Sequence, residues 1–174
     1  MNTMQLFSRA YIAVGFMLIT SCFPDNDAPP SANLQHNPVF MTRPILEKSI
    51  VFSEARPITN GGKIHTYLDY LFIVENFDGI HILDNSDPAN PYKMGFLVCP
   101  GAIDVSVKDG VIYVDNAVDL VSIKLTSLPT VEILDRVKDV FPEHLPPGAA
   151  EMPEHARKEN RDASYILIKW IPKK

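Results

Sequence analysis

Residues 70–84 read YLFIVENFDGIHILD, and residues 110–124 read GVIYVDNAVDLVSIK. Aligned at a spacing of 40 residues, both stretches carry two short apolar runs on either side of a polar centre. The positions that match at this spacing are Gly61 and Gly101, Asp69 and Asp109, Val74 and Val114, Asn76 and Asn116, Glu75 and Asp115, and Leu83 and Ile123. A period in this range indicates a repeated supersecondary unit. The chain therefore contains an internal repeat.

Further short apolar runs surround these two stretches. They are rich in β-branched and aromatic residues, and Gly, Asn, Asp and Pro separate them, which is the composition of strands joined by turns. The predicted strands are residues 63–68, 70–75, 79–84, 92–98, 103–108, 111–116, 119–124 and 131–138. Asp78-Gly79 and Asp109-Gly110 supply tight turns between them. The sequence predicts an all-β fold whose units of about 40 residues hold about four strands each, as a β-propeller blade does.

The repeats resemble the LVIVD-repeat family. The resemblance covers roughly residues 61–142 and depends on residues 70–74, 79–91, 110–115 and 119–124. The second repeat departs from the family pattern at Ser122 and Lys124, where the family favours an apolar residue and Asp. The resemblance implies a propeller-like fold in a lipid-anchored or secreted protein. It implies no characterised activity.

The number of repeats is too small for a closed propeller, which usually has four to eight blades. Two clear units and a partial one before Gly61 predict two to three blade-like antiparallel sheets and an incomplete ring. Either an oligomer or a partner chain covers the open sheet edges, or the chain is the amino-terminal part of a longer protein. The run Tyr165–Ile171 is predicted to be one more strand.

The amino terminus has the three zones of an export signal. Arg9 supplies a positive charge, the apolar run AYIAVGFMLIT covers residues 10–20, and Ser21 precedes Cys22. The apolar run is shorter than the roughly 20 residues that cross a bilayer. Residues 18–22, LITSC, resemble a lipobox. The resemblance implies cleavage before Cys22 and acylation of its thiol and new amine, with palmitate or related chains anchoring the mature protein.

The sequence divides into four segments. We expect a lipoprotein signal peptide at residues 1–21 and a disordered, proline-rich tether at 22–44. We expect the β-repeat domain at 45–142, followed by a loop and a terminal strand at 143–174. Residues 153–174 carry a formal net charge of +3, against −9 for residues 22–152. That asymmetry favours contact with an acidic partner, or belongs to a solvated loop and tail.

Charge and cysteine content narrow the function classes. The mature chain has a formal net charge of −6, because the cleaved segment removes Arg9 from the total of −5. An acidic chain without a basic stripe argues against nucleic acid as a partner. After acylation of Cys22 only Cys99 remains as a thiol. Its apolar surroundings, GFLVC at residues 95–99, favour a buried hydrophobe over a reactive or intermolecular thiol.

Patterns that indicate catalysis or metal binding are missing from the sequence. The five histidines, at positions 36, 65, 81, 144 and 155, show no zinc-ligand spacing, so no metal site is predicted. Residues 84–91, DNSDPANP, lack the Gly and the bidentate acid of a helical calcium loop, and they favour consecutive turns. Glu75 and Asp115 recur once in each repeat, which is typical of residues that cap turns or join neighbouring units.

These observations predict a lipoprotein of the cell envelope, anchored in the outer membrane on its periplasmic or surface face. Its β domain is predicted to have a binding or structural role, with no catalytic residues, no cofactor and an unknown ligand. Besides the membrane, another protein or an envelope polymer is the expected partner. The alternatives are a truncated fragment without independent activity, and an enzyme or metal-dependent module whose site is not visible in the sequence.

Overall fold

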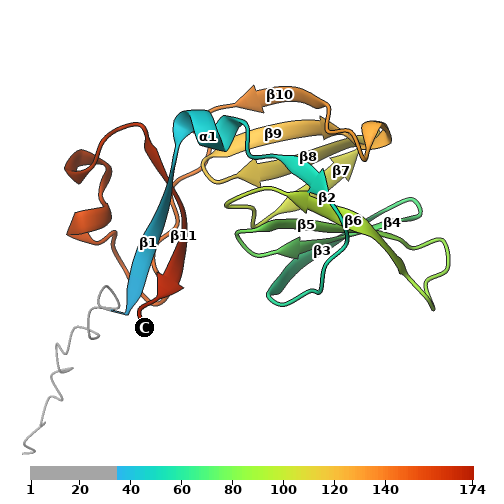
Figure 1. Cartoon of the computed structure of the whole chain (residues 1–174), viewed down its shortest axis with the longest axis horizontal. Coiled ribbons are helices and arrows are strands. Elements are labelled where there is room, and N and C mark those ends of the chain that lie inside the picture. Colours follow the sequence, from blue (N-terminus) through green and yellow to red (C-terminus); the bar gives the residue numbers. More distant parts are fainter. Residues whose placement is uncertain (1–34) are drawn as a thin grey trace, which may run out of the picture. The chain divides into compact units, whose positions relative to one another are not determined.

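The computed structural model describes residues 35–174. These residues form three antiparallel sheets, and none of the sheets closes on itself (Figure 1). The strand orders are β1-β11, β10-β9-β8-β7 and β2-β6-β5-β4-β3. The all-β prediction is confirmed. No helix in residues 35–174 has the length and apolar composition of a membrane span.

Each sequence repeat is one four-stranded antiparallel meander. The first contains β3 (Gly61–Tyr67), β4 (Tyr70–Glu75), β5 (Gly79–Asp84) and β6 (Tyr92–Val98), and β2 (Val51–Ser53) pairs with β6. The second contains β7 (Val105–Lys108), β8 (Val111–Asn116), β9 (Asp119–Lys124) and β10 (Ile133–Val137). The 3₁₀ helix η2 (Leu125–Ser127) connects β9 to β10. Strands that are neighbours in the sequence are therefore neighbours in each sheet, as the predicted strands and turns required.

The two repeats are offset by one residue within their central hairpins. In β4 and β8 the buried residues match at a spacing of 40, as Phe72 and Ile112 do. In β5 and β9 they match at 41, because Ile82 and Ile123 both enter the core. The extra residue lies in the β8–β9 connection. A one-residue shift moves every side chain of a strand to the other face. The extra residue therefore explains why Ser122 and Lys124 depart from the repeat pattern.

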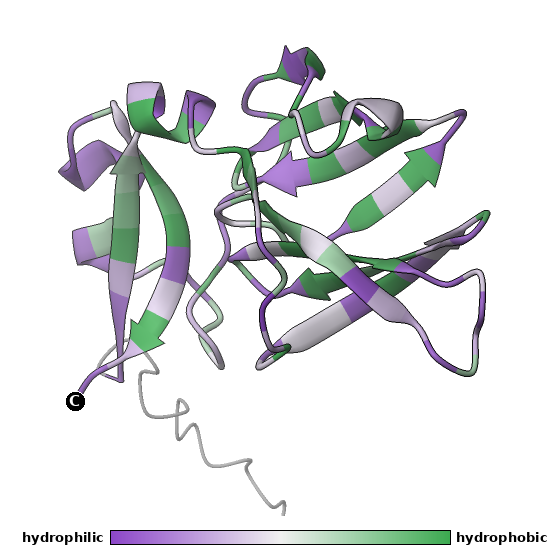
Figure 2. Cartoon of the chain, turned by 45° about the vertical axis from the view of Figure 1, so that its right-hand side comes forward, coloured by the Kyte–Doolittle hydropathy of each residue, from purple (hydrophilic) through white to green (hydrophobic). Residues whose placement is uncertain are grey.

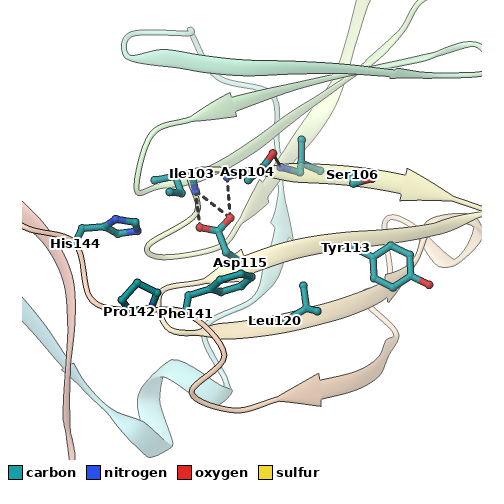
Figure 3. A pocket seen from close by; sticks show the side chains of 10 residues that line it. Ile103, Asp104, Ser106, Tyr113, Asp115, Leu120, Phe141, Pro142 and His144 are labelled. Carbon is teal, nitrogen blue, oxygen red and sulfur yellow. Dashed lines mark hydrogen bonds between the residues drawn. The ribbon is translucent and has the colours of Figure 1, made fainter.

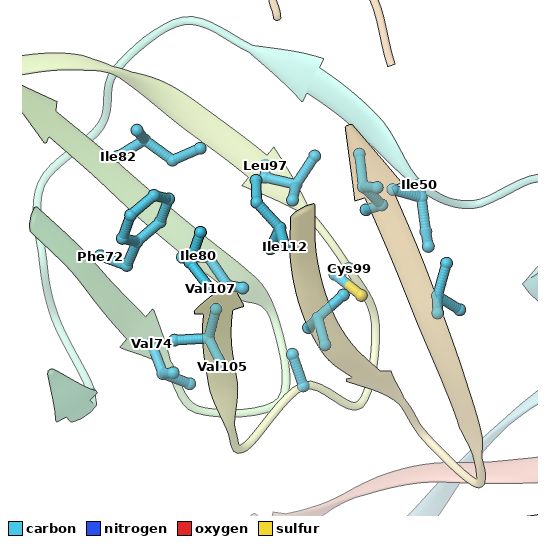
Figure 4. Close-up of a cluster of buried hydrophobic side chains, with 14 of the residues drawn as sticks. Ile50, Phe72, Val74, Ile80, Ile82, Leu97, Cys99, Val105, Val107 and Ile112 are labelled. Carbon is cyan, nitrogen blue, oxygen red and sulfur yellow. The ribbon is translucent and has the colours of Figure 1, made fainter. Parts of the chain in front are cut away.

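The two meanders bury equivalent faces in one shared core. Phe72, Val74, Ile80 and Ile82 of the first repeat belong to the same buried cluster as Ile112, Val114, Val121 and Ile123 of the second (Figure 4). In a propeller, neighbouring blades are related by rotation about the central axis, so each blade packs one face against the opposite face of the next blade. Here the equivalent faces meet, so each repeat covers the apolar face of the other. Figure 2 shows the apolar segments along the central strands.

Side chains of β3 close the junction between the two sheets. The Nε2 atom of His65 accepts a hydrogen bond of 3.1 Å from the backbone N–H of Val107. The hydroxyl oxygen of Tyr67 accepts one of 3.0 Å from the N–H of Gly110. Lys63 forms an ion pair with Asp104. The first contact satisfies a donor on the free edge of β7 and the second satisfies one in the β7–β8 turn, so part of an edge that would otherwise offer a template for strand addition is covered.

The third sheet joins the two ends of the described chain. β1 (His36–Thr42) pairs with β11 (Tyr165–Pro172), and the helix α1 (Arg43–Glu47) follows β1. The predicted tether of residues 22–44 therefore differs from the structure at its carboxyl-terminal end, where β1 begins at His36. No local sequence pattern predicts β1, because its partner strand lies at the other end of the sequence. The predicted terminal strand is confirmed, with β1 as its partner.

The segment before β11 packs against the third sheet. It contains the 3₁₀ helices η3 (Glu154–Ala156) and η4 (Lys158–Asn160). Ala156 is buried with Leu167 and Trp170, and the indole N–H of Trp170 donates a 2.8 Å hydrogen bond to the carbonyl oxygen of His144. The other face of the sheet, with Ile166 and Ile168, packs on the turn after β8. Part of the loop predicted within residues 143–174 therefore packs against the third sheet.

The shared core predicts unequal effects of two isoleucine truncations. Ile112→Ala removes a side chain that is 0% exposed, and should lower the free energy of unfolding by about 2–5 kcal/mol. Ile64→Ala alters a residue that is 64% exposed on the opposite face of its sheet. This substitution should change the free energy of unfolding by less than about 0.5 kcal/mol. Urea unfolding of the full chain measures both. Similar losses for the two variants would contradict this assignment of the buried faces.

Candidate functional site

Two buried carboxylates occupy equivalent places at the end of the second strand of each repeat. Glu75 accepts hydrogen bonds from the backbone N–H groups of Thr59, at 3.1 Å, and Asn60, at 2.7 Å. The Thr59 hydroxyl also donates to Glu75, and the Nε2 atom of His81 lies 3.0 Å from its Oε2 atom. Glu75 thereby holds the loop that enters β3.

Asp115 holds the corresponding loop of the second repeat. Its carboxylate accepts hydrogen bonds from the backbone N–H groups of Ile103, at 2.9 Å, and Asp104, at 2.8 Å. The next residue acts in the same direction, because Asn116 donates from its side chain to the carbonyl oxygen of Pro100 at 2.8 Å. The prediction that the recurring acids cap turns is confirmed. Among residues 35–174, no side chain donates a hydrogen bond to Asp115, which is how it differs from Glu75.

The surroundings shift the pKa values of the two acids in opposite directions. Burial by itself raises the pKa of Glu75, but hydrogen bonds from Thr59, His81 and Asn60 outweigh it and lower the pKa from 4.5 to about 2. Burial also raises the pKa of Asp115, and here the backbone N–H groups of Asp104 and Ile103 do not reverse the shift from 3.8. Asp115 is thus a buried acid whose charge is incompletely compensated.

A cavity of about 270 Å³ lies over Asp115, on the face of the second repeat opposite the shared core (Figure 3). The three strands β7, β8 and β9 form its floor, and the chain after β10 forms one wall. It is lined by Ile103, Asp104, Val105, Ser106, Tyr113, Asp115, Leu120, Phe141, Pro142 and His144. Apolar side chains with a few polar groups and a perturbed acid are typical of ligand sites. This cavity is the candidate functional site.

His144 contributes an unpaired polar atom at the cavity. The Nε2 atom of its ring is inaccessible to solvent and has no hydrogen-bond partner in the described part of the chain. The ring packs edge-on against Phe77, with 5.7 Å between ring centroids. No hydrogen bond joins His144 to either Ser106 or Asp115 among the described contacts. The arrangement therefore lacks the nucleophile–base contact expected of a hydrolytic triad.

In the first repeat the equivalent face is filled by its own chain. Besides the Thr59 hydroxyl and the His81 imidazole on Glu75, the guanidinium of Arg56 lies 3.6 Å from the centroid of the Phe96 ring. His81 itself packs against Phe96, with 4.8 Å between ring centroids. His81 and Phe96 are paired residues of β5 and β6. The corresponding pair in the second repeat is Ser122 and Asp135, which leaves this face less covered.

Other residues singled out in the sequence have structural positions. Cys22 lies outside the described residues. Cys99 is fully buried, its thiol donates to the carbonyl oxygen of Asp115 at 3.5 Å, and burial raises its pKa far above the ordinary range. Asp84 and Asp87 accept hydrogen bonds from the backbone of Ser86 and Ala89, so this segment forms the predicted turns. Within residues 35–174, no three His, Cys, Asp or Glu side chains gather as metal ligands.

Sequence reasoning missed an ion-pair cluster around Asp119. This fully buried carboxylate lies 2.6 Å from Arg43 and 2.8 Å from Arg136. Arg43 also contacts Asp139 at 2.8 Å. The cluster joins the β1–α1 junction to the second repeat. The local signal is weak: at the spacing of 41 that relates β5 to β9, Asp119 is the counterpart of Asp78, and a recurring acid does not identify distant arginine partners.

No family model, no curated protein and no solved structure matches this chain. The resemblance to LVIVD repeats and the function therefore remain predictions.

The opposite pKa shifts predict opposite contributions to acid unfolding. Between about pH 2 and 4.5 the unfolded chain binds the Glu75 proton and the folded chain does not, so this acid contributes stability that is lost as the pH falls. In Glu75→Gln the free energy of unfolding should therefore decrease less steeply as the pH is lowered through this range. Asp115 binds its proton more tightly when folded, so its contribution to stability falls as the pH rises above 3.8. Asp115→Asn should therefore steepen the fall in stability towards acid pH.

Urea unfolding between pH 2.5 and 7 provides the measurement. Glu132→Gln, which alters an exposed residue by the same unit of charge, serves as the control. Parallel pH profiles for Glu75→Gln, Asp115→Asn and the control would show that neither buried acid is linked to folding.

Proposed function

We propose that this chain is a lipoprotein of the bacterial cell envelope, held in the outer membrane by acyl chains on Cys22. Its β domain has a binding or structural role and no catalytic chemistry of its own. The observation that carries the proposal is the sequence LITSC at residues 18–22, which follows a charged residue and an apolar run. Two or three acyl chains give stable membrane attachment, because each buried methylene contributes about 0.8 kcal/mol.

The start of the fold supports this anchoring. β1 begins at His36, 14 residues after Cys22 (36 − 22). A chain of that length reaches at most about 50 Å when fully extended. The β domain would therefore stay near the membrane surface, on the periplasmic or the outer face.

The use of the polar residues supports a binding or structural role over catalysis. The buried acids Glu75 and Asp119 and the imidazole of His81 are all engaged in contacts within the fold. The cavity over Asp115 is mainly apolar. Among the described contacts, no hydrogen bond joins the Ser106 hydroxyl, the Asp115 carboxylate and the His144 imidazole. A domain with such a cavity fits a ligand- or partner-binding module better than an enzyme.

We propose that the repeats derive from propeller-type units and share an origin with LVIVD repeats. The 40-residue spacing and the two meanders support this proposal. Their face-to-face packing offers a way for a pair of repeats to fold without the remaining blades of a ring, since each supplies the apolar surface that the other must bury. This favours an independently folded domain over a fragment.

The anchor predicts the outcome of one substitution. Cys22→Ala removes the acceptor for acylation, so incorporation of labelled palmitate and retention in the membrane fraction should both be lost. The β domain should still fold, because it begins 14 residues further on, and its far-ultraviolet circular dichroism should be unchanged. If the Cys22→Ala protein remained in the membrane fraction with full acyl labelling, the anchor assignment would be wrong.

The shared core predicts a folded chain in which both repeats are protected. Amides of β4 and β8 should exchange with solvent at similar slow rates, because both strands lie at the centre of one cooperative core. Hydrogen exchange by mass spectrometry, together with sedimentation in detergent solution, tests this. Fast exchange confined to one repeat, or protection that appears only in an oligomer, would instead favour a truncated or partner-dependent protein.

A further inference from the structure

The cavity over Asp115 and the filled face of the first repeat are two versions of one site. Glu75 and Asp115 are equivalent in the repeat, and both accept backbone N–H groups from the loop before the first strand. In the first repeat the chain itself supplies a hydroxyl and an imidazole to the carboxylate. The second repeat has the carboxylate and a nearby imidazole, with about 270 Å³ of space beside them.

We propose that this cavity binds a small, mainly apolar molecule carrying one hydroxyl group, such as an alkyl-substituted phenol. The hydroxyl takes the place that Thr59 Oγ1 occupies on Glu75, and its apolar body lies between Leu120, Tyr113 and Phe141. The inference deepens the binding role proposed above by assigning its site and its ligand class.

The buried carboxylate of Asp115 matches a ligand with a single hydroxyl. Within the described residues Asp115 receives only backbone N–H donors, whereas a carboxylate has about four acceptor sites. A hydroxyl has one donor hydrogen, so a single such group can occupy a free acceptor site of Asp115 without leaving a further donor unpaired in the apolar cavity.

The size and lining of the cavity set the rest of the ligand. An apolar protein cavity of about 150 Å³ is enough to bind benzene, so a cavity of about 270 Å³ accommodates a substituted benzene ring. Tyr113 and Phe141 are 38% and 37% exposed, so both rings retain apolar surface that a ligand can cover. Aromatic ligands pack favourably in offset or edge-on contact with such rings.

The test uses a matched pair of probes on the acylated full-length protein in detergent micelles. 4-Ethylphenol carries the hydroxyl, and ethylbenzene has the same apolar body without it. We expect 4-ethylphenol to cause saturable amide shifts at Tyr113, Asp115 and Leu120, and ethylbenzene to bind at least tenfold more weakly. Equal affinities for the two probes, or saturable shifts that fall elsewhere in the protein, would overturn the proposal. Benzylamine is a third probe, and preferential binding of the amine would overturn the assigned class.

Two matched variants separate loss of the site from loss of the fold. Ser106 is an exposed residue of β7 paired with Tyr113, and Ser106→Phe places a ring in the cavity. Ile64 is the exposed residue paired with Ile73, the counterpart of Tyr113 in the first repeat. Ile64→Phe should keep the affinity for 4-ethylphenol within twofold, and Ser106→Phe should abolish the saturable shifts. Unchanged binding in Ser106→Phe would exclude this cavity.

The result is independent of the membrane anchor. Loss of acylation in Cys22→Ala tests the lipoprotein assignment, and probe binding by that variant should equal that of the acylated protein. A protein that is acylated and retained in the membrane but does not bind 4-ethylphenol would refute the ligand class while leaving the anchor intact.

Discussion

The shared core between the two repeats is the constraint on which the described structure depends. Each four-stranded meander has an apolar face that is stabilised only when another surface removes it from water. Here Phe72 and Val74 of one repeat and Ile112 and Val114 of the other lie in the same buried cluster. Packing equivalent faces together leaves the opposite faces outside, and the first repeat buries His81 and Phe96 there with its own chain. The need for further repeats to complete a hydrophobic core is thereby removed.

The buried carboxylates organise the edges of this core. Glu75 and Asp115 each hold the loop that enters their own repeat, and Asp119 joins the second repeat to Arg43 at the start of α1. A buried charge requires hydrogen bonds or counter-charges, because desolvation otherwise favours the neutral form. Glu75 and Asp119 have side-chain partners of this kind. The donors to Asp115 that the described residues supply are all backbone N–H groups, and a cavity lies beside it.

The difference between the two outer faces connects the fold to the proposed function. Duplicated units begin with the same surface, and the first repeat covers that surface with Arg56, Thr59 and the ring of His81. The second repeat leaves an apolar cavity bounded by the chain after β10. A repeated sequence permits such a division of roles, in which the second repeat binds a ligand and the first repeat covers the equivalent face with its own chain. The acyl anchor proposed at Cys22 would present this domain close to a membrane.

The sequence by itself determined the all-β class, the repeat, the turns and the expectation of an anchor, because these depend on local composition and short-range periodicity. It also placed Glu75 and Asp115 as structural acids, since they recur at one spacing. Only the tertiary structure decided that equivalent faces meet, since period-2 patterns show which residues share a face and not what covers it. The pairing of β1 with β11, the Asp119 cluster and the cavity at His144 join residues distant in the sequence, and such long-range contacts leave no local pattern to read.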